Sequence, residues 1–257
     1  MTDRAQREVR ATYPATRTLE GAGVPIRRAL PPPNGRYDLV DPFLLLDDVE
    51  LIPGAGPSFP PHPHRGFEIL TYLVTGGMSH EDSEGNKAGV GAGGLQHIVA
   101  GKGMWHGEEI DVAAGPMRGI QMWINVPRAE KGVDPRYQLV DGPDVPVTRD
   151  GSATVRRLAG DGGAVRFARP SMYRDVTVDA DAEVTIEIPD GWQGFAYVID
   201  GGGQFGSDGD VVGPWTNAIL GTTGDLRVVT GPGGVRFMLG AAMPIGEAPR
   251  WRGPYVD

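Results

Sequence analysis

Side chains that commonly bind metals recur at even spacing in the stretch Gly56–Gly76, which reads G-P-S-F-P-P-H-P-H-R-G-F-E-I-L-T-Y-L-V-T-G. His62, His64 and Glu68 have even numbers, so on an extended strand they project from one face. Burying an unpaired imidazole or carboxylate costs about 2 kcal/mol or more, so this arrangement needs a compensating partner. A metal ion meets that need.

A second group of such side chains lies in G-L-Q-H-I-V-A-G-K-G-M-W-H-G-E-E, residues 94–109. His106 and Glu108 are two residues apart and share one face of a strand. With His62 and His64 they give three imidazoles and one carboxylate, a set that suits iron, manganese, copper, nickel or zinc. A six-coordinate ion would keep open positions for water, substrate or dioxygen. The sequence therefore predicts a metal site that performs chemistry.

Glycine and proline, 40 and 23 of the 257 residues, punctuate short apolar runs rather than forming tracts. This pattern predicts turns in an all-β protein, and no strong amphipathic helix is found. Residues 7–30 read as two strands joined by the Gly21–Gly23 turn. Further strands are expected at 67–75, 78–82, 88–91, 95–100 and 118–126, then near 153–158, 164–168, 175–178, 183–188, 194–199, 211–220, 225–230 and 235–241.

The chain has no cysteine, which excludes disulfides, thiolate metal sites and cysteine nucleophiles. Its net charge of −9, without a basic cluster, argues against nucleic acid or an anionic membrane as a partner. No apolar signal core or membrane-spanning run is found. We expect a cytoplasmic protein.

An internal repeat indicates two equivalent lobes. T-Y-L-V-T-G-G at 71–77 is matched 125 positions later by A-Y-V-I-D-G-G at 196–202. The same offset places Glu187 at the position of His62 and Gly231 at that of His106, and no histidine follows His106. The second lobe is therefore predicted to repeat the architecture without the ligands.

The first cluster has the pattern G-x5-H-x-H-x3-E and the second G-x-G-x2-H, which resemble the two cupin motifs. The strings D-P-F-L-L-L-D-D, H-P-H-R-G-F-E, H-E-D-S-E-G-N, L-Q-H-I-V-A-G-K-G-M-W-H-G-E-E and Q-M-W-I-N-V resemble the pirin family, most clearly over residues 17–137. The resemblance implies an all-β bicupin, in which two antiparallel β-barrel or jelly-roll lobes pack together. Residues 1–137 are then expected to form a metal-binding lobe and residues 138–257 a lobe without ligands.

Carried over by residue, the resemblance places the metal ligands at His62, His64, His106 and Glu108. It implies one divalent transition metal, with Fe(II) the expected ion. Glu68 occupies a position where many other cupins have a ligand, and here we interpret it as a supporting residue that holds a ligand histidine or the strand geometry.

The resemblance also implies a function, an iron-dependent dioxygenase of the quercetin 2,3-dioxygenase type that cleaves a planar enediol such as a flavonol. Glu108 is then the candidate catalytic proton acceptor. Met104, Trp105, Phe67 and Met122 are candidates for the apolar walls of the substrate site, or for barrel core. The alternative is a non-catalytic, iron- and redox-sensing protein that regulates a protein partner; an isomerase or other cupin chemistry is a third possibility.

Several polar residues have a simpler interpretation. His97 stands where many pirins have an aromatic residue, and we interpret it as a hydrogen-bonded histidine rather than a pocket residue. His80 is interpreted as a hydrogen-bonding loop residue, and Asp47 and Asp48 as turn or capping residues. Glu109 is expected to face solvent.

Residues 201–206 match G-x-G-x-x-G after a strand, the setting of a dinucleotide-binding turn. The helix that such a turn requires is missing, because S-D-G-D-V-V-G-P reads as turn and strand. We interpret the motif as a hairpin and expect no nucleotide cofactor.

Overall fold

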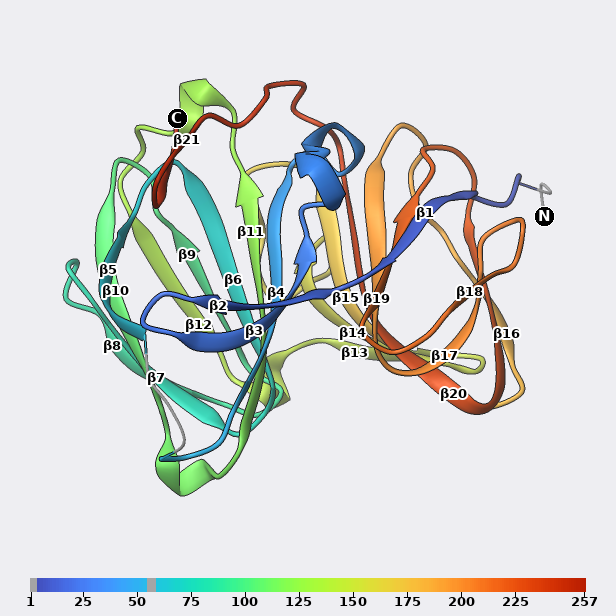
Figure 1. The fold of residues 1–257 in the computed structure, drawn as a ribbon, viewed down its shortest axis with the longest axis horizontal. Coiled ribbons are helices and arrows are strands. Elements are labelled where there is room, and N and C mark those ends of the chain that lie inside the picture. The colour runs from blue at the N-terminus through green and yellow to red at the C-terminus, as the bar shows by residue number, and fades with distance from the viewer. Residues whose placement is uncertain (1–3, 55–58) are drawn as a thin grey trace. The chain divides into compact units, whose positions relative to one another are not determined.

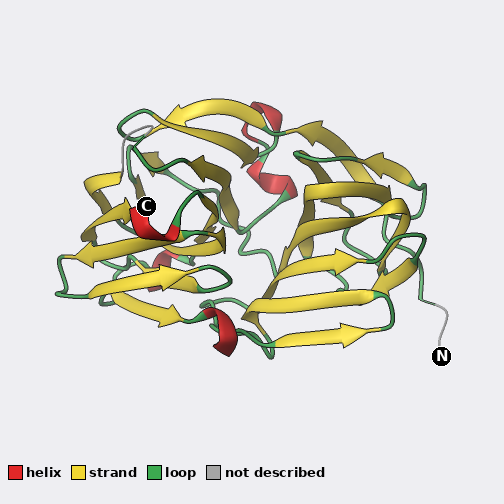
Figure 2. Cartoon of the chain, turned by 90° about the horizontal axis from the view of Figure 1, so that it is seen from below, coloured by secondary structure: helices red, strands yellow, loops and turns green. Residues whose placement is uncertain are grey.

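The structure, a computed structural model, describes residues 4–54 and 59–257. Residues 55–58, at the start of the Gly56–Gly76 stretch, lie outside the described part. Figure 2 shows that strands dominate the fold and that helices are confined to short single turns. All paired strands in the described ranges run antiparallel, and the all-β prediction is confirmed.

The strands are β1 (Val9–Pro14), β2 (Thr16–Glu20), β3 (Val24–Leu30), β4 (Phe43–Leu51), β5 (Phe59–His64), β6 (Phe67–Thr75), β7 (Gly77–Asp82), β8 (Lys87–Gly91), β9 (Leu95–Val99), β10 (Met104–Ile110), β11 (Met117–Asn125), β12 (Arg136–Val140), β13 (Val147–Asp150), β14 (Ala153–Gly160), β15 (Ser171–Val178), β16 (Glu183–Ile186), β17 (Gln193–Phe205), β18 (Asp210–Val212), β19 (Thr216–Leu220), β20 (Leu226–Ala242), β21 (Trp251–Arg252) and β22 (Tyr255–Val256). The 3-10 turns are η1 (Pro33–Gly35), η2 (Tyr37–Leu39), η3 (Val112–Ala114), η4 (Arg128–Glu130) and η5 (Gly142–Asp144). In the described part of the chain, no helix is long and apolar enough to cross a membrane.

The chain folds into two compact units whose segments alternate along the sequence. The histidine unit contains residues 16–31, 42–145 and 245–257, and the C-terminal unit contains residues 1–15, 32–41 and 146–244. The N-terminal segment of the chain therefore belongs to the C-terminal unit, and the C-terminal segment belongs to the histidine unit. The division into lobes at residues 137 and 138 stays a prediction.

The histidine unit holds a seven-stranded sheet in the order β12-β9-β6-β11-β4-β3-β2 and a four-stranded sheet in the order β5-β10-β7-β8 (Figure 1). β6 reproduces the predicted strand 67–75, and its residues from Phe67 to Leu73 are all buried. A strand buried on both faces shows no apolar–polar alternation, which explains the continuous apolar run in the sequence. Residues 7–30 form three strands rather than two, because β1 belongs to the C-terminal unit.

Asp47 and Asp48 lie within β4 and do not cap or turn, so their predicted role is wrong. The side chain of Arg28 donates hydrogen bonds to both carboxylate oxygens of Asp47, at 2.9 and 2.7 Å. Arg118 does the same to Asp48, at 3.0 and 2.7 Å. Because neighbouring residues of a strand face opposite ways, each buried carboxylate has its own arginine partner.

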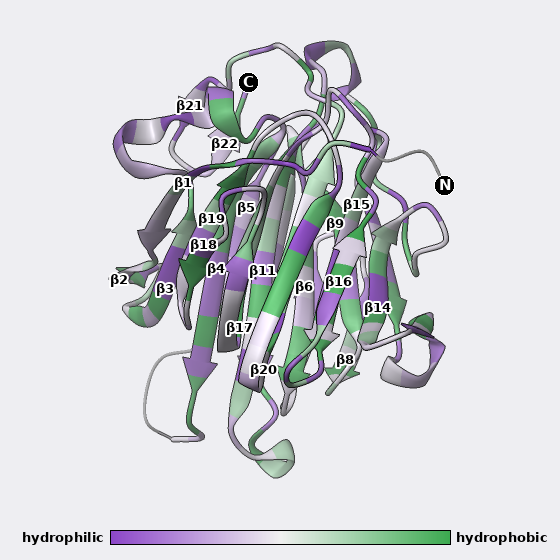
Figure 3. Ribbon diagram, turned by 90° about the vertical axis from the view of Figure 1, so that its right-hand side faces the viewer, coloured by the Kyte–Doolittle hydropathy of each residue, from purple (hydrophilic) through white to green (hydrophobic). Residues whose placement is uncertain are grey.

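The C-terminal unit is built on one sheet in the order β1-β19-β17-β20-β15-β14-β13, with β16 paired to β20 and β18 to β17. The strands expected at 225–230 and 235–241 are one long strand, β20, whose hydropathy is visible in Figure 3. Residues 164–168 hold an isolated β-bridge at Val165 but no strand, and residues 211–220 are divided between β18 and β19. The glycine motif at 201–206 runs along β17, and the turn of the hairpin to β18 follows Phe205.

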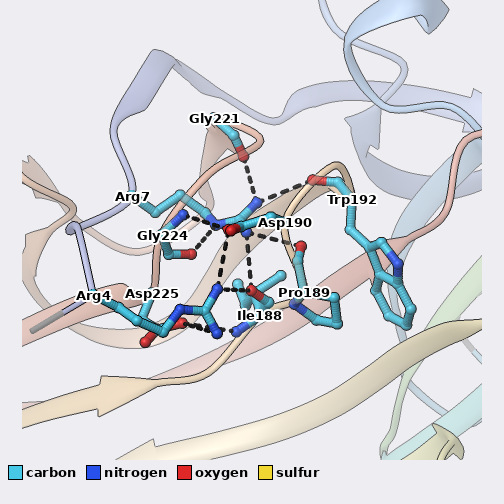
Figure 4. A network of polar contacts seen from close by, with 9 residues as sticks. All are labelled: Arg4, Arg7, Ile188, Pro189, Asp190, Trp192, Gly221, Gly224 and Asp225. Atoms are coloured by element: carbon cyan, nitrogen blue, oxygen red, sulfur yellow. Dashed lines mark hydrogen bonds and ion pairs between the residues drawn. The ribbon is translucent and has the colours of Figure 1, made fainter. Parts of the chain in front are cut away.

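The N-terminal segment is held in the C-terminal unit by the guanidinium of Arg7, whose side chain is fully buried. Figure 4 shows this group among backbone carbonyls of two loops. It donates to the carbonyl oxygens of Gly224, Trp192, Gly221, Ile188 and Pro189 at 2.8, 3.0, 2.6, 3.1 and 3.1 Å. Burial lowers the pKa of Arg7, and the carboxylates of Asp190 and Asp225 act against that shift.

We expect Arg7→Met to lower the free energy of unfolding by about 3 kcal/mol or more, because it leaves several buried carbonyls without a donor, each at about 1–3 kcal/mol. Arg10→Met is the matched control. Arg10 is exposed and forms an ion pair with Glu8, so its substitution should change the free energy of unfolding by about 0.5 kcal/mol or less. Urea denaturation followed by circular dichroism measures both; equal losses would contradict the anchoring role.

Candidate metal centre

The pairing of β10 with strands on both sides brings the polar side chains of the histidine unit together. On one side, His106 stands opposite His62 of β5, and Met104 stands opposite His64. On the other side, Glu108 stands opposite His80 of β7, and His106 opposite Asp82. Directly opposed residues share a face of the sheet, so the register alone places these side chains beside one another.

The imidazole rings of His62, His64 and His106 are mutual neighbours. The ring centroids are 4.7 Å apart for His62 and His64, 4.4 Å for His62 and His106, and 5.1 Å for His64 and His106. Their ligand atoms all lie within 4.8 Å of one another, and those of His80, His106 and Glu108 do so as well. The two groups overlap at His106, and together they could hold a metal ion.

Backbone contacts select the nitrogen that the first two histidines present. Nδ1 of His62 lies 2.8 Å from the carbonyl oxygen of Pro60, and Nδ1 of His64 lies 3.4 Å from that of Pro254. A carbonyl only accepts, so each Nδ1 carries the proton and each Nε2 keeps a free lone pair. This second contact to the backbone is typical of histidines that bind metals.

His106 meets the requirement of a ligand most clearly. It is buried, and neither ring nitrogen has a hydrogen-bond partner among the described residues. Burial, followed by its histidine neighbours, lowers the pKa of His106 to about 2; burial and His62 lower that of His64 to about 3. The rings are therefore neutral at physiological pH, and an ion between them would bind the lone pairs that are otherwise orphaned. The residues present fit a metal.

Glu108 contributes a buried carboxylate to the same face. Burial raises the pKa of Glu108 to about 7, while a hydrogen bond from Nε2 of Gln96 to its Oε1 acts in the opposite direction. Gln96 is itself fully buried and accepts from the hydroxyl of Tyr137 at 3.3 Å. Gln96 therefore fixes the orientation of Glu108. The sequence did not reveal this role, because Gln96 lies on β9 and Glu108 on β10, which belong to different sheets.

His80 lies in β7 and not in a loop, although it is a hydrogen-bonded residue as predicted. Its Nε2 contacts Oδ2 of Asp82 at 3.1 Å, and its ring stacks on Tyr137 with centroids 4.3 Å apart. Its buried Nδ1 has no partner in the described ranges, and the ring centroid lies 5.4 Å from that of His106. The alternation H-E-D in the expected strand 78–82 carried this signal, since His80 and Asp82 share one face.

Glu68 and His97 form a separate buried pair in the large sheet. Nε2 of His97 lies 2.6 Å from Oε2 of Glu68. The hydrogen-bonded interpretation of His97 is confirmed, and the histidine that Glu68 contacts here is His97. Glu109 is exposed, as expected from its opposite parity to Glu108.

The segment 245–257 reinforces the strand that carries His64. Arg65 pairs with Asp257 at 2.7 Å and lies over the ring of Tyr255, and the amide of Val256 donates to the carbonyl of Arg65. A Cβ added at Gly66, whose φ is +86°, would lie 2.0 Å from the carbonyl oxygen of Val256, so glycine is required for this close approach. The His64 ring is also packed edge-on against Trp123, with centroids 4.8 Å apart.

A cavity of about 480 Å³ adjoins the cluster and is lined by His80, His106 and Glu108 together with Trp105. Trp105 is 54% exposed and is the single predicted wall residue that lines this cavity. The other three candidates, Met104, Phe67 and Met122, are buried in the core. Of these, Phe67 still contacts the His64 ring, at a centroid distance of 5.3 Å.

Comparison with known proteins identifies the family. The Pirin family matches residues 23–124, and the Pirin C-terminal cupin domain matches residues 173–257. Pirin of Homo sapiens is 35% identical over 248 residues, covering 92% of this chain and 83% of the relative. The chain belongs to the pirin family. Pirin-like protein 2 of Arabidopsis thaliana is 34% identical over 257 residues, covering 92% of this chain and 75% of the relative.

Solved structures of pirins and related cupins share the fold. GK1651 from Geobacillus kaustophilus is 29% identical with a TM-score of 0.83, covering 95% of this chain and 99% of that chain. A quercetin 2,3-dioxygenase from Acinetobacter baumannii is 25% identical with a TM-score of 0.87, covering 98% and 92%. The predicted all-β bicupin fold is thereby confirmed.

Removing a clustered histidine should abolish metal binding while leaving the fold intact. We expect His62→Ala and His106→Ala to lose bound metal, measured by elemental analysis of the purified protein. His97→Gln is the matched control, because His97 is buried and bonded to Glu68 outside the cluster, and it should keep the wild-type metal content. Full occupancy in His106→Ala would remove that residue from the ligand set.

Gln96→Leu tests the support given to Glu108. Loss of a residue that orients a ligand commonly weakens metal affinity about 10- to 100-fold, and we expect a change of that size in a competition titration with a chelator. Gln121→Leu is the control, since Gln121 donates to Thr71 rather than to a clustered residue. Unchanged affinity in Gln96→Leu would show that Glu108 is positioned without it.

Proposed function

We propose that this pirin is a metal-dependent dioxygenase that cleaves a flavonol such as quercetin. The observation that carries the proposal is a cluster of three imidazoles, those of His64 and His106 buried, with one buried carboxylate beside an open cavity. Similarity to the quercetin 2,3-dioxygenase from Acinetobacter baumannii, over most of both chains, supports the same assignment.

His62, His64, His106 and Glu108 would hold the ion, and Fe(II) is the metal we propose for them. The set of three imidazoles and a carboxylate suits several divalent transition metals, and the bacterial pirin YhhW from Escherichia coli was solved in complex with nickel(II). When bound, iron supplies Lewis acidity and a redox couple. The ligand atoms of His80, His106 and Glu108 lie within 4.8 Å of one another, so His80 is a further candidate to bind the ion or a water molecule beside it.

Glu108 is the proposed proton acceptor. A general base works best when its pKa is near the operating pH, and burial raises the pKa of Glu108 to about 7. A carboxylate bound to a divalent cation stays ionised and is a weak base, so Glu108 would take the proton of an acidic enediol hydroxyl by exchanging its place on the ion for that proton. Gln96 keeps the carboxylate aimed at the site during this transfer.

The cavity beside the cluster suits a planar substrate. Its apolar side is formed by Phe59, Pro60, Pro61 and Trp105, which offer flat surfaces to an aromatic ring. The polar side carries His80, His106 and Glu108, at which the enediol oxygens would be oriented. A volume of about 480 Å³ lies within the range of small-molecule sites, about 300–1,000 Å³.

Anaerobic loading with Fe(II), followed by oxygen uptake in the presence of quercetin, tests the proposal. We expect turnover by the loaded protein and a fall in kcat of about 100-fold or more for Glu108→Gln, because a positioned base commonly contributes about 10²–10⁴ in rate. Glu130→Gln is the control: Glu130 is exposed in η4, does not line the cavity, and its substitution should leave kcat unchanged. A fully loaded protein that consumes no oxygen with quercetin would contradict the proposal.

The second candidate function is an iron- and redox-sensing pirin that regulates a protein partner without turnover. The exposed Trp105 favours it, because a large aromatic surface beside the cluster could report the charge of the ion to a partner. Iron-loaded protein that lacks oxygenase activity but changes the fluorescence of Trp105 on oxidation would favour this alternative.

A further inference from the structure

Two arginines stand directly opposite each other in the sheet of the C-terminal unit. The antiparallel pairing of β14 and β15 places Arg157 against Arg174. Directly opposed side chains of an antiparallel pair have Cβ atoms about 5 Å apart, and like charges in that position are destabilising. Such a pair requires either a separate partner for each cation or an anion between them.

Both arginines are on the face of the sheet that carries the apolar core. Val155 of β14, and Met172 and Val176 of β15, have the same parity and pack in the core cluster of this unit. Arg157 and Arg174 therefore project to the same side as these apolar residues. An open cavity of about 900 Å³ lies there and is lined by both arginines.

Neither guanidinium has a hydrogen bond or an ion pair to another side chain within the ranges that the structure describes. The Nε of Arg157 is buried and has no hydrogen-bond partner there. Burial and the neighbouring Arg157 lower the pKa of Arg174, and Asp161 acts in the opposite direction. Asp161 is not within ion-pair distance of Arg174, because none of the ion pairs within 4.0 Å among the described residues includes Asp161.

Two other charged residues that line the cavity, Arg4 and Glu183, form ion pairs with residues other than the two facing arginines. Arg4 pairs with Asp190 at 3.0 Å and Asp225 at 3.4 Å. Glu183 accepts two hydrogen bonds from Arg227, both at 2.8 Å. The remaining acids that line the cavity, Asp150, Asp161 and Glu187, are exposed, and none of them is in an ion pair with Arg157 or Arg174 within the described residues. The two facing arginines are thus the cations of this cavity that lack a carboxylate partner.

On the opposite face of the same strands, the arginines lie beside a carboxylate. There Asp175 accepts hydrogen bonds from Arg236 at 2.9 and 2.6 Å, and it stands opposite Arg156. Arg156, the neighbour of Arg157, does not line the cavity. A carboxylate therefore separates the arginines on that face, whereas the cavity face has no equivalent group between Arg157 and Arg174.

We propose that the C-terminal unit binds a small organic anion, with a carboxylate or phosphate group between Arg157 and Arg174. Guanidinium groups match the two oxygens of such anions, and charge-assisted hydrogen bonds to both would relieve the repulsion within the pair. Ile186, Ile188 and Trp192 line the same cavity and provide an apolar surface for the body of the ligand. Arg7 donates a hydrogen bond to the backbone carbonyl of Trp192, and the indole ring of Trp192 extends away from Arg7 (Figure 4).

Calorimetric titration of the metal-loaded protein with benzoate, phenyl phosphate, inorganic phosphate and neutral benzamide tests the site. We expect saturable one-to-one binding of benzoate or phenyl phosphate and none of benzamide, and the tighter of the two identifies the anionic group. Arg157→Gln and Arg174→Gln should each weaken binding about tenfold or more, as expected for loss of a charge-assisted contact. Arg156→Gln, the matched control on the other face, should stay within about twofold of the wild type.

Thermal unfolding without ligand separates binding from a structural role. Removing one of two like charges should leave the Tm of Arg174→Gln equal to or above that of the wild type, and the Tm rise caused by the bound probe should disappear. Absence of saturable binding by every anionic probe, equal binding of benzamide, or unchanged affinity in both arginine variants would overturn the proposal. A lower Tm or loss of folding in ligand-free Arg174→Gln would do the same, because it would assign that arginine to structure.

Discussion

The cost of burying polar side chains without partners governs the histidine unit. β10 lies between β5 and β7, and the register of these three strands puts six imidazole- or carboxylate-bearing residues on one face: His62, His64, His80, Asp82, His106 and Glu108. His106, at the centre, has both ring nitrogens buried without a partner among the described residues. An apolar core would cost less free energy, and a group that binds the lone pairs would offset the cost of this arrangement.

The surrounding structure keeps these lone pairs aimed at one point. Backbone carbonyls of Pro60 and Pro254 hold the protonated nitrogens of His62 and His64, while Gln96 holds Glu108. These contacts come from a preceding strand residue, from the segment 245–257 and from β9, so distant parts of the sequence set the geometry. Supporting contacts of this kind decide whether a set of ligands binds one ion well or several poorly.

The C-terminal unit has a similar strand architecture but a different polar interior. Where the histidine unit gathers neutral imidazoles, the C-terminal unit sets Arg157 opposite Arg174 beside apolar core residues. In the described part of the chain, both groups that could hold a metal belong to the histidine unit. A duplicated fold can thus carry different chemistry in each copy, because the strands fix positions while the side chains at those positions decide what binds.

The sequence by itself determined the all-β fold, because glycine and proline divide short apolar runs, and it predicted that His62 and His64 share one face, as do His106 and Glu108, because a period of two fixes the face of each side chain. It misplaced Asp47 and Asp48, since a buried aspartate looks like a turn residue until its arginine partner from another strand is known. It also predicted two strands where β1, β2 and β3 form, placed His80 in a loop rather than in β7, and did not identify Gln96 or the facing arginines. Only the tertiary structure decided these points, because strand order and register, which set the partners of a residue, depend on contacts far apart in the chain.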